Sequence, residues 1–262
     1  MSVDAIFVQD GDRFTATDLA LGPWAPGMLH GGAAAALLLH AFCEAAPAGL
    51  QPARVTYEFL RPVPQGPLTP EVSLLRAGRR VTLLDGVLRD GDGDGADVTR
   101  ARALFMVPSD IGVAGGGPPP FPGPSEGEPS DWALRATRMF ASHGMEIRFI
   151  EGHFREPGPA TAWFRLRYPL IAGGDTAPVE LLAAAGDFGN GIASVLSWDE
   201  HVFINADLTL YIEREPAGEW VALQSETRVA PGSVAVVDSA LWDERGRIGR
   251  AVQSIVVGRR PT

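Results

Sequence analysis

The chain repeats one order of helix and strands on either side of a stretch rich in proline and glycine. That stretch lies between residues 108 and 130 and contains the run Gly115-Gly116-Gly117-Pro118-Pro119-Pro120, a mixture that holds neither a helix nor a sheet ladder. On each side a helical run precedes an alternating strand and further strands joined by tight turns. We therefore predict an N-terminal domain over residues 1–110, a linker over 111–130 and a C-terminal domain over 131–262.

Each half begins its pattern with an apolar helix. The first is predicted to start at Gly31 and to stop near Pro47, and it is apolar on nearly every side, so we expect it to be buried. The second is predicted to start at Pro178, a residue suited to a first helical turn, and to run on toward Leu196. The two helices occupy equivalent places in the repeat.

The strands of the two halves can be superimposed by setting Arg61 on Arg214, a shift of 214 − 61 = 153 residues. The last strands match at 251 − 101 = 150, because the turn before them is three residues longer in the first half. A long buried helix followed by an antiparallel sheet, twice over, predicts an α+β fold. We identify it as a double hotdog, two fused hotdog domains that each wrap an antiparallel sheet around a long central helix.

Composition narrows the class of protein. The net charge is −10 over 262 residues, and all 22 basic residues are arginines. An acidic surface repels nucleic acid phosphates, so no nucleic acid partner is expected. The longest apolar stretch is far shorter than the roughly 20 residues that span a bilayer, so no membrane segment is expected either. Residues 1–4 do not resemble a signal peptide, and the single Cys43 cannot form an internal disulfide, which predicts a cytoplasmic protein.

Three polar residues of the second half stand where the first half has unlike residues. They are Asp207 in place of Arg54, Thr227 in place of Leu74 and Gln253 in place of Ala103. Gln253 interrupts an apolar strand, and a buried amide without partners costs about 1–3 kcal/mol. Because neighbouring strands lie only about 4.8 Å apart, the three side chains could meet around one water molecule. Alternatively, Asp207 caps a turn, Thr227 is an ordinary strand residue and Gln253 faces solvent at an edge.

Several strings of the sequence resemble a known family. Gly22-Pro23-Trp24 and Leu29-His30-Gly31-Gly32-Ala33 resemble the helix entry of hotdog thioesterases. In the second half, the strings that resemble the TesB-like acyl-CoA thioesterase superfamily are Glu151-Gly152, Pro157-Gly158-Pro159-Ala160-Thr161-Ala162-Trp163, Ala185-Gly186-Asp187-Phe188-Gly189-Asn190-Gly191 and Phe203-Ile204-Asn205-Ala206-Asp207-Leu208-Thr209. The resemblance implies a thioester hydrolase of fatty acid metabolism that splits a small-molecule acyl-CoA into free acid and CoA without a cofactor.

The resemblance also implies catalytic residues. In the acyl-CoA thioesterase II enzymes an aspartate, a threonine or serine, and a glutamine of the C-terminal hotdog bind the attacking water. By position these roles fall on Asp207, Thr227 and Gln253, with Ser225 as an alternative hydroxyl. Asp187, in the second helix, is a reserve acid.

The substrate's carbonyl oxygen is expected at a helix N-terminus, where free N–H groups favour negative charge. Gly31 and Gly32 are candidates because they let the substrate approach the backbone. His30 is a candidate contact of the thioester, with helix capping as the alternative. Candidate residues of an apolar tunnel for the acyl chain are Leu37, Phe42, Phe188 and Ile192. Candidate ligands of the CoA phosphates are Arg79 and Arg80.

Other functions were weighed against hydrolysis. A non-hydrolytic acyl-CoA binding protein would keep the fold and lose the water site. A hotdog dehydratase or hydratase needs a histidine paired with an acid; His30 and His40 are available, but no matching acid is evident in the sequence.

Gly123-Pro124-Ser125-Glu126-Gly127 fits a nucleophilic serine elbow, but it lies in the linker without the strand and helix that the elbow needs. No zinc-type Cys/His cluster is present, so no metal is expected. A homo-oligomer of double-hotdog subunits stays open.

Overall fold

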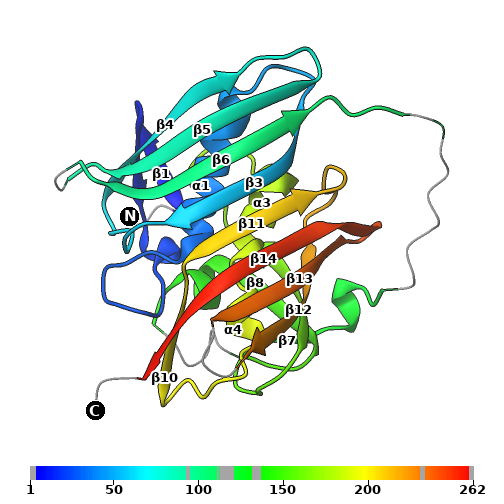
Figure 1. Cartoon of the computed structure of the whole chain (residues 1–262). Helices are drawn as coiled ribbons and strands as arrows, with labels where there is room; N and C mark the ends of the chain where they lie inside the picture. Colours follow the sequence, from blue (N-terminus) through cyan, green and yellow to red (C-terminus); the bar gives the residue numbers. More distant parts are fainter. Residues whose placement is uncertain are drawn as a thin grey trace.

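The structure is a computed structural model that describes residues 4–92, 95–110, 112, 121–131, 137–230 and 234–259. Over these residues, a single sheet of 14 strands carries two main helices, α1 (Gly31–Ala45) and α3 (Pro178–Gly186), which lie behind the sheet in Figure 1. Strands of the first half fill the upper part of that view and strands of the second half the lower part. This arrangement agrees with the predicted α+β fold.

The first half contributes β1 (Phe7–Asp10), β2 (Arg13–Ala16), β3 (Gln51–Phe59), β4 (Pro67–Arg76), β5 (Val81–Asp90) and β6 (Asp97–Met106). The second half contributes β7 (Glu128–Pro129), β8 (Met145–Glu151), β9 (Ala160–Leu166), β10 (His201–Asn205), β11 (Asp207–Ile212), β12 (Val221–Val229), β13 (Ala235–Asp243) and β14 (Gly246–Arg259). The short helical turns are η1 (Asp18–Ala20), η2 (Pro124–Glu126), η3 (Phe140–Gly144) and α4 (Gly189–Ile192). The spatial order is β1-β2-β4-β5-β6-β3-β11-β14-β13-β12-β9-β8-β7, with β10 also paired to β14.

The two halves join where β3 pairs with β11 in antiparallel fashion. In this register Thr56 lies opposite Thr209, and their Oγ1 atoms are 3.3 Å apart. Since 209 − 56 = 153, the two residues that face each other are also the two that the sequence repeat makes equivalent. A local two-fold relation therefore passes between them, and the predicted duplication is confirmed strand by strand, with β4 and β5 corresponding to β12 and β13.

The two long helices lie against each other in opposite directions. His30, at the start of α1, meets Asp187 just beyond the end of α3, while His40, late in α1, meets Glu180 in the first turn of α3. Gly32 allows the close approach, because a Cβ there would overlap the carbonyl oxygen of Ala184. Among the described residues, neither these helices nor any other combines the length and apolarity required to cross a bilayer.

The first predicted helix is confirmed, but the second is interrupted. Instead of running on toward Leu196, α3 ends at Gly186, and α4 resumes at Gly189 after Asp187 and Phe188. Gly189 lies directly on the sheet: a Cβ there would be 2.7 Å from Ser239 Oγ and 2.8 Å from Gln253 Oε1. The break therefore lets the chain contact β13 and β14, and it turns Asp187 toward the N-terminus of α1.

Part of the predicted linker lies outside the described residues, namely 111 and 113–120. Its later part packs on the second half. Phe121 stacks on Trp242 with ring centroids 4.3 Å apart, and Trp163 Nε1 donates a hydrogen bond of 2.9 Å to the Pro122 carbonyl. The domain boundaries at 110 and 131 stay a prediction, but residues 121–129 lie with the C-terminal half.

Candidate active site

The Asp187 carboxylate is the centre of a buried polar cluster between the two halves. Its side chain is 6% exposed. Asn205 Nδ2 donates to its Oδ1 at 2.6 Å, and Gln253 Nε2 lies 3.4 Å from the same oxygen. His30 Nδ1 lies 3.1 Å from Oδ2. The cluster thus joins the N-cap of α1, the C-cap of α3 and the strands β10 and β14.

The proton on His30 can be assigned from these contacts. Nδ1 lies 3.1 Å from Asp187 Oδ2 and also 3.1 Å from the backbone nitrogen of Gly32, and one nitrogen cannot both donate to the first and accept from the second. A buried carboxylate needs donors, so we place the proton on Nδ1, donating to Asp187. Nε2 then forms no hydrogen bond to any residue that the structure describes, and it is free to contact a ligand.

The environment keeps Asp187 ionised. Burial by itself raises the pKa of this carboxyl, but hydrogen bonds from His30 and Asn205, the charge of His30 and the backbone N–H of Gly32 outweigh it. The net result is a pKa below the ordinary aspartate value. A carboxylate held in this way accepts hydrogen bonds from a water molecule at neutral pH.

Gly31 makes room for this carboxylate, and Gly32 donates its backbone N–H to it. A Cβ on Gly31 would lie 2.7 Å from Asp187 Oδ2, so any side chain there would displace it. The N-terminus of α1, which sequence reasoning reserved for the substrate's carbonyl oxygen, is instead where the Asp187 carboxylate lies, and the helix dipole stabilises this negative charge. The two glycines therefore contribute to the site by leaving space and a backbone N–H for Asp187.

Gln253 is buried, and its amide has partners, as a buried amide in this strand requires. Oε1 accepts from the backbone nitrogen of Asn190 at 3.3 Å, and Nε2 donates to the backbone oxygen of Asp187 at 3.2 Å. The amide thus ties β14 to the break between α3 and α4. The edge-facing alternative for Gln253 is wrong.

Asp207 does not join this cluster, and the predicted meeting of Asp207, Thr227 and Gln253 needs correction. In the pairing of β11 with β14, Leu210 faces Ala251 and Thr209 faces Val252. Because side chains alternate along a strand, Asp207 shares a face with Thr209, while Gln253 shares the opposite face with Ala251. Asp207 Oδ1 accepts from the backbone nitrogen of Ser254 at 2.5 Å. It therefore caps the kink between β10 and β11. This is the structural alternative, a turn cap, that the sequence left open for Asp207.

Thr227 faces inward but lies apart from Gln253. Val237 pairs with both residues and separates them, which places their strands about 10 Å apart. The Thr227 hydroxyl is buried and has no hydrogen-bond partner among the described residues. The alternative hydroxyl, Ser225, is engaged with Ser239 at 2.7 Å.

Asn205 is the residue that sequence reasoning missed. Its Nδ2 holds Asp187, while its Oδ1 is buried without a hydrogen-bond partner in the part of the chain that the structure describes. Alternation breaks at Ala206: Phe203 and Leu208 are both buried although they lie five residues apart. The only sequence signal for Asn205 was its presence in a string already noted for its family resemblance.

The polar cluster borders a small cavity of about 40 Å³. Its walls include Pro23, Trp24, His30, Ala141, Phe154, Asp187, Phe188, Asn190, Gly191, Trp198 and Asn205. A cavity needs roughly 10–15 Å³ of such space to hold one water molecule, so this one is large enough for a water beside Asp187. Four of its residues, Pro23, Trp24, Phe154 and Trp198, also line a larger open depression of about 630 Å³.

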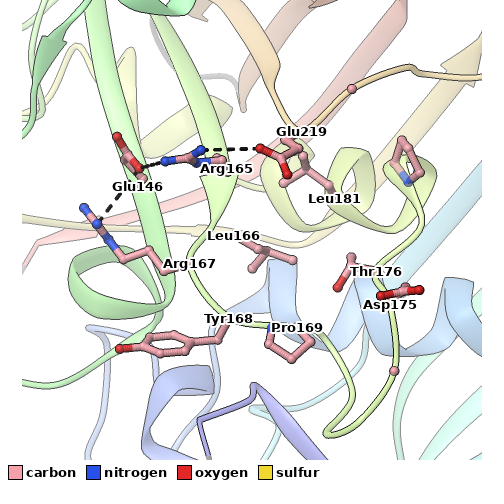
Figure 2. A pocket seen from close by; sticks show the side chains of 13 residues that line it. Glu146, Arg165, Leu166, Arg167, Tyr168, Pro169, Asp175, Thr176, Leu181 and Glu219 are labelled. Carbon is pink, nitrogen blue, oxygen red and sulfur yellow. Dashed lines mark hydrogen bonds and ion pairs between the residues drawn. The ribbon is translucent and has the colours of Figure 1, made fainter.

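A second large pocket lies at the other end of α3, near Pro178, and has a volume of about 550 Å³. Figure 2 shows Glu146 between Arg165 and Arg167 in this pocket. Glu146 also pairs with Arg148, at 2.8 Å, and Glu219 pairs with Arg165, so the arginines of this pocket are engaged in ion pairs within the protein. The nine residues of α3 span about 13 Å, which separates this pocket from Asp187.

The residues proposed for the acyl chain and the CoA phosphates lie in different places. Phe188 lines the small cavity, whereas Leu37, Phe42 and Ile192 are fully buried in the core. Arg79 and Arg80 are exposed in the turn between β4 and β5 of the first half. Their roles as tunnel and phosphate ligands stay predictions.

Comparison with known proteins follows the same division of the chain. The model of the acyl-CoA thioesterase N-terminal domain matches residues 20–106, and that of the acyl-CoA thioesterase C-terminal domain matches residues 116–257. No curated protein matches.

Solved structures share the fold over nearly the whole chain. A tesB protein of Mycobacterium avium subspecies paratuberculosis is 20% identical, with a TM-score of 0.67 and coverage of 97% of this chain and 96% of its own. The acyl-CoA thioesterase II TesB2 of Mycobacterium marinum is 15% identical, with a TM-score of 0.67 and coverage of 98% and 96%. A conserved hot dog fold protein of unknown function from Alicyclobacillus acidocaldarius is 18% identical, with a TM-score of 0.73 and coverage of 99% and 97%. With both domain models matched in order along one double-hotdog chain, the protein belongs to the acyl-CoA thioesterase family and is a thioester hydrolase.

Proposed function

We propose that the protein hydrolyses an acyl-CoA thioester with a water molecule held by Asp187 and Asn205 in the C-terminal hotdog. The observation that carries the proposal is a buried, ionised carboxylate bordering a water-sized cavity, next to an amide oxygen that lacks a partner among the described residues. The proposal keeps the expected acid and amide chemistry, but it places the acid on Asp187 instead of Asp207 and lets Asn205 replace the expected hydroxyl.

In this mechanism the water donates one hydrogen bond to Asp187 and one to Asn205 Oδ1, which turns an oxygen lone pair toward the thioester carbonyl carbon. Asp187 takes the proton as the C–O bond forms. When the tetrahedral intermediate collapses, the C–S bond breaks and CoA leaves as a thiolate, which takes the proton from Asp187. Asp187 returns to the carboxylate, and the products are the free acid and CoA.

Gln253 and His30 hold Asp187 through different atoms. Gln253 fixes the segment that carries Asp187, since its amide bonds both the Asp187 carbonyl and the Asn190 nitrogen. His30 is held by Asp187 through its protonated Nδ1, which leaves the unprotonated Nε2 as a hydrogen-bond acceptor for an N–H or O–H group at the site. A carboxylate commonly orients a histidine ring through one of its nitrogens in this way.

A second candidate function is hydration or dehydration of an acyl-CoA. The sequence offered no acid to pair with a histidine, but His30 and Asp187 lie 3.1 Å apart. Because this is the histidine–acid pair that a hydratase needs, hydration is tested directly with an α,β-unsaturated acyl-CoA.

The deciding experiment measures free thiol release from acyl-CoA substrates by the full chain and by Asp187→Asn. Release by the wild type that is lost in the variant, with acyl-CoA binding retained, supports hydrolysis. Loss of the enoyl absorbance without thiol release would favour hydration instead. Binding without either reaction would identify a non-hydrolytic acyl-CoA binding protein, and unchanged hydrolysis by the variant would remove Asp187 from the mechanism.

A further inference from the structure

The small cavity and the larger depression adjoin each other and share the lining residues Pro23, Trp24, Phe154 and Trp198. Trp24, from the first half, stacks on Trp198, from the second, with ring centroids 5.4 Å apart and planes inclined by 10°. Phe154 accepts a hydrogen bond from Trp198 Nε1 through its carbonyl oxygen at 2.8 Å. The Asp187 cavity of about 40 Å³ and the open depression of about 630 Å³ meet at these residues.

The space beyond Asp187 is filled with aromatic rings. Phe188 lies 4.4 Å from His30, 5.9 Å from Phe140 and 5.0 Å from Phe164, measured between ring centroids. Protein cores are close-packed and do not yield a long channel without cost. An acyl group that enters the cavity therefore meets a packed wall after a few carbon atoms.

The outer depression has the opposite character. It carries the exposed guanidinium of Arg155, which forms no ion pair with any residue that the structure describes, together with Ser197 and the faces of the tryptophans. Arginine binds phosphate oxygens in a fork geometry, and a mixed polar and aromatic surface suits an arm that contains amides. A long alkyl chain would gain little beside a charged group and hydroxyls.

The geometry points to a short-chain acyl-CoA as the substrate class, with the phosphopantetheine arm in the depression and an acyl group of only a few carbons in the cavity. This inference rests on the proposed hydrolysis at Asp187. It assigns Arg155 to a phosphate of CoA, and it assigns to Phe154 and Gly191 the limit on acyl length.

Gly191 offers a variant that tests the limit without unfolding the protein. It lines the cavity, and a Cβ added there would have Phe154 Cε1, at 3.9 Å, as its nearest neighbour. Gly191→Ala therefore adds one methyl group to the cavity at ordinary contact distance. Gly258→Ala is the matched control, because a Cβ at that surface position meets nothing within 4 Å.

The experiment compares kcat/KM for acetyl-, butyryl-, octanoyl- and palmitoyl-CoA. We expect the wild type to favour the two short substrates over octanoyl- and palmitoyl-CoA by about tenfold or more, and Gly191→Ala to reduce butyryl-CoA hydrolysis about tenfold relative to acetyl-CoA. Gly258→Ala should keep the wild-type profile. Equal or better turnover of palmitoyl-CoA by the wild type, or an unchanged profile in Gly191→Ala, would overturn the inference.

Arg155 is tested with two substrates that carry the same acyl group. Arg155→Ala should raise KM for acetyl-CoA but not for acetyl N-acetylcysteamine, which lacks the phosphates, whereas Arg228→Ala, an exposed arginine on β12, should change neither. Equal effects of Arg155→Ala on the two substrates would overturn the assignment. If no acyl-CoA of any length is hydrolysed, the proposed function itself fails; if a different length profile is found, only this inference fails.

Discussion

The two ends of the α1–α3 helix pair carry the same kind of contact in two different settings. At one end His30 of the first half meets Asp187 of the second, and at the other His40 meets Glu180, with Nδ1 2.7 Å from Oε1. In both cases a histidine on or next to α1 and an acid in or beside α3 bridge the halves. The two pairs lie at opposite ends of the antiparallel helix pair, and their surroundings differ.

At the Asp187 end, polar groups of β10 and β14 converge and a cavity lies beside the acid. At the Glu180 end, the second carboxylate oxygen accepts from the backbone nitrogen of Ala177 at 2.8 Å and closes the first turn of α3. Phe14 packs edge-on against His40, and burial raises the pKa of the nearby Cys43 thiol to about 12. A histidine–acid pair is therefore not a site by itself; the adjoining strands and cavity make one end chemical and leave the other structural.

The largest expected effect separates the two acids. Asp187→Asn should reduce kcat by about 10²–10⁴-fold, the contribution typical of a general base, while acyl-CoA binding persists. Glu180→Gln, the equivalent change at the other end, should leave kcat essentially unchanged. Thiol-release kinetics measure both. Equal losses in the two variants would show that the comparison does not distinguish catalysis from packing.

A smaller loss is expected when the acid is moved instead of removed. In Gly31→Ala the new Cβ would collide with Asp187 Oδ2, and a misplacement of about 1 Å can cost on the order of 10²-fold in rate. The loss should appear in kcat with near-normal KM and a folded circular dichroism spectrum. Full activity in this variant would mean that the carboxylate can shift freely, contrary to a site held in one geometry.

The Glu180 end should show itself in stability as a function of pH. The hydrogen bond from His40 to Glu180 raises the pKa of His40, against the opposing effect of burial and with help from the charges of Glu180 and Glu44. A raised folded-state pKa stabilises the fold below the unfolded value of about 6.5. This contribution is lost as pH rises from about 6.5 through the raised folded-state pKa.

The measurement is urea unfolding at a series of pH values. The wild type should lose stability across this window, and His40→Gln should lack that component of the pH dependence. If the free energy of unfolding of His40→Gln varied with pH in parallel with that of the wild type, the His40–Glu180 pair would not be the cause of this pH dependence.

The smallest effects are expected at the two residues that the structure sets apart from the cluster. Asp207→Asn and Thr227→Val should both retain kcat, because neither side chain contacts Asp187 or lines the cavity. Thr227→Val should leave the free energy of unfolding unchanged or raise it by up to about 1 kcal/mol, since it removes a buried hydroxyl that lacks a partner among the described residues. A large loss of activity in Thr227→Val would restore the predicted water ligand.

The sequence by itself determined the duplication, the α+β class and the first helix, whereas the burial of Gln253 was one of two alternatives that it left open. These features depend on periodicity and on apolar composition, which are local properties of the chain. The shift of 153 residues even anticipated that Thr56 and Thr209 would be equivalent, although it could not reveal that they face each other across the junction.

Only the tertiary structure decided which acid accompanies Gln253. A strand that kinks changes the face on which every following side chain lies, and the irregularity at Ala206 placed Asn205 inside and Asp207 outside. The break after Gly186 likewise turned Asp187 from a helical position toward the N-terminus of α1, some 150 residues away in the chain. Contacts of this kind depend on how the two halves pack together, which the pattern of a single segment does not encode.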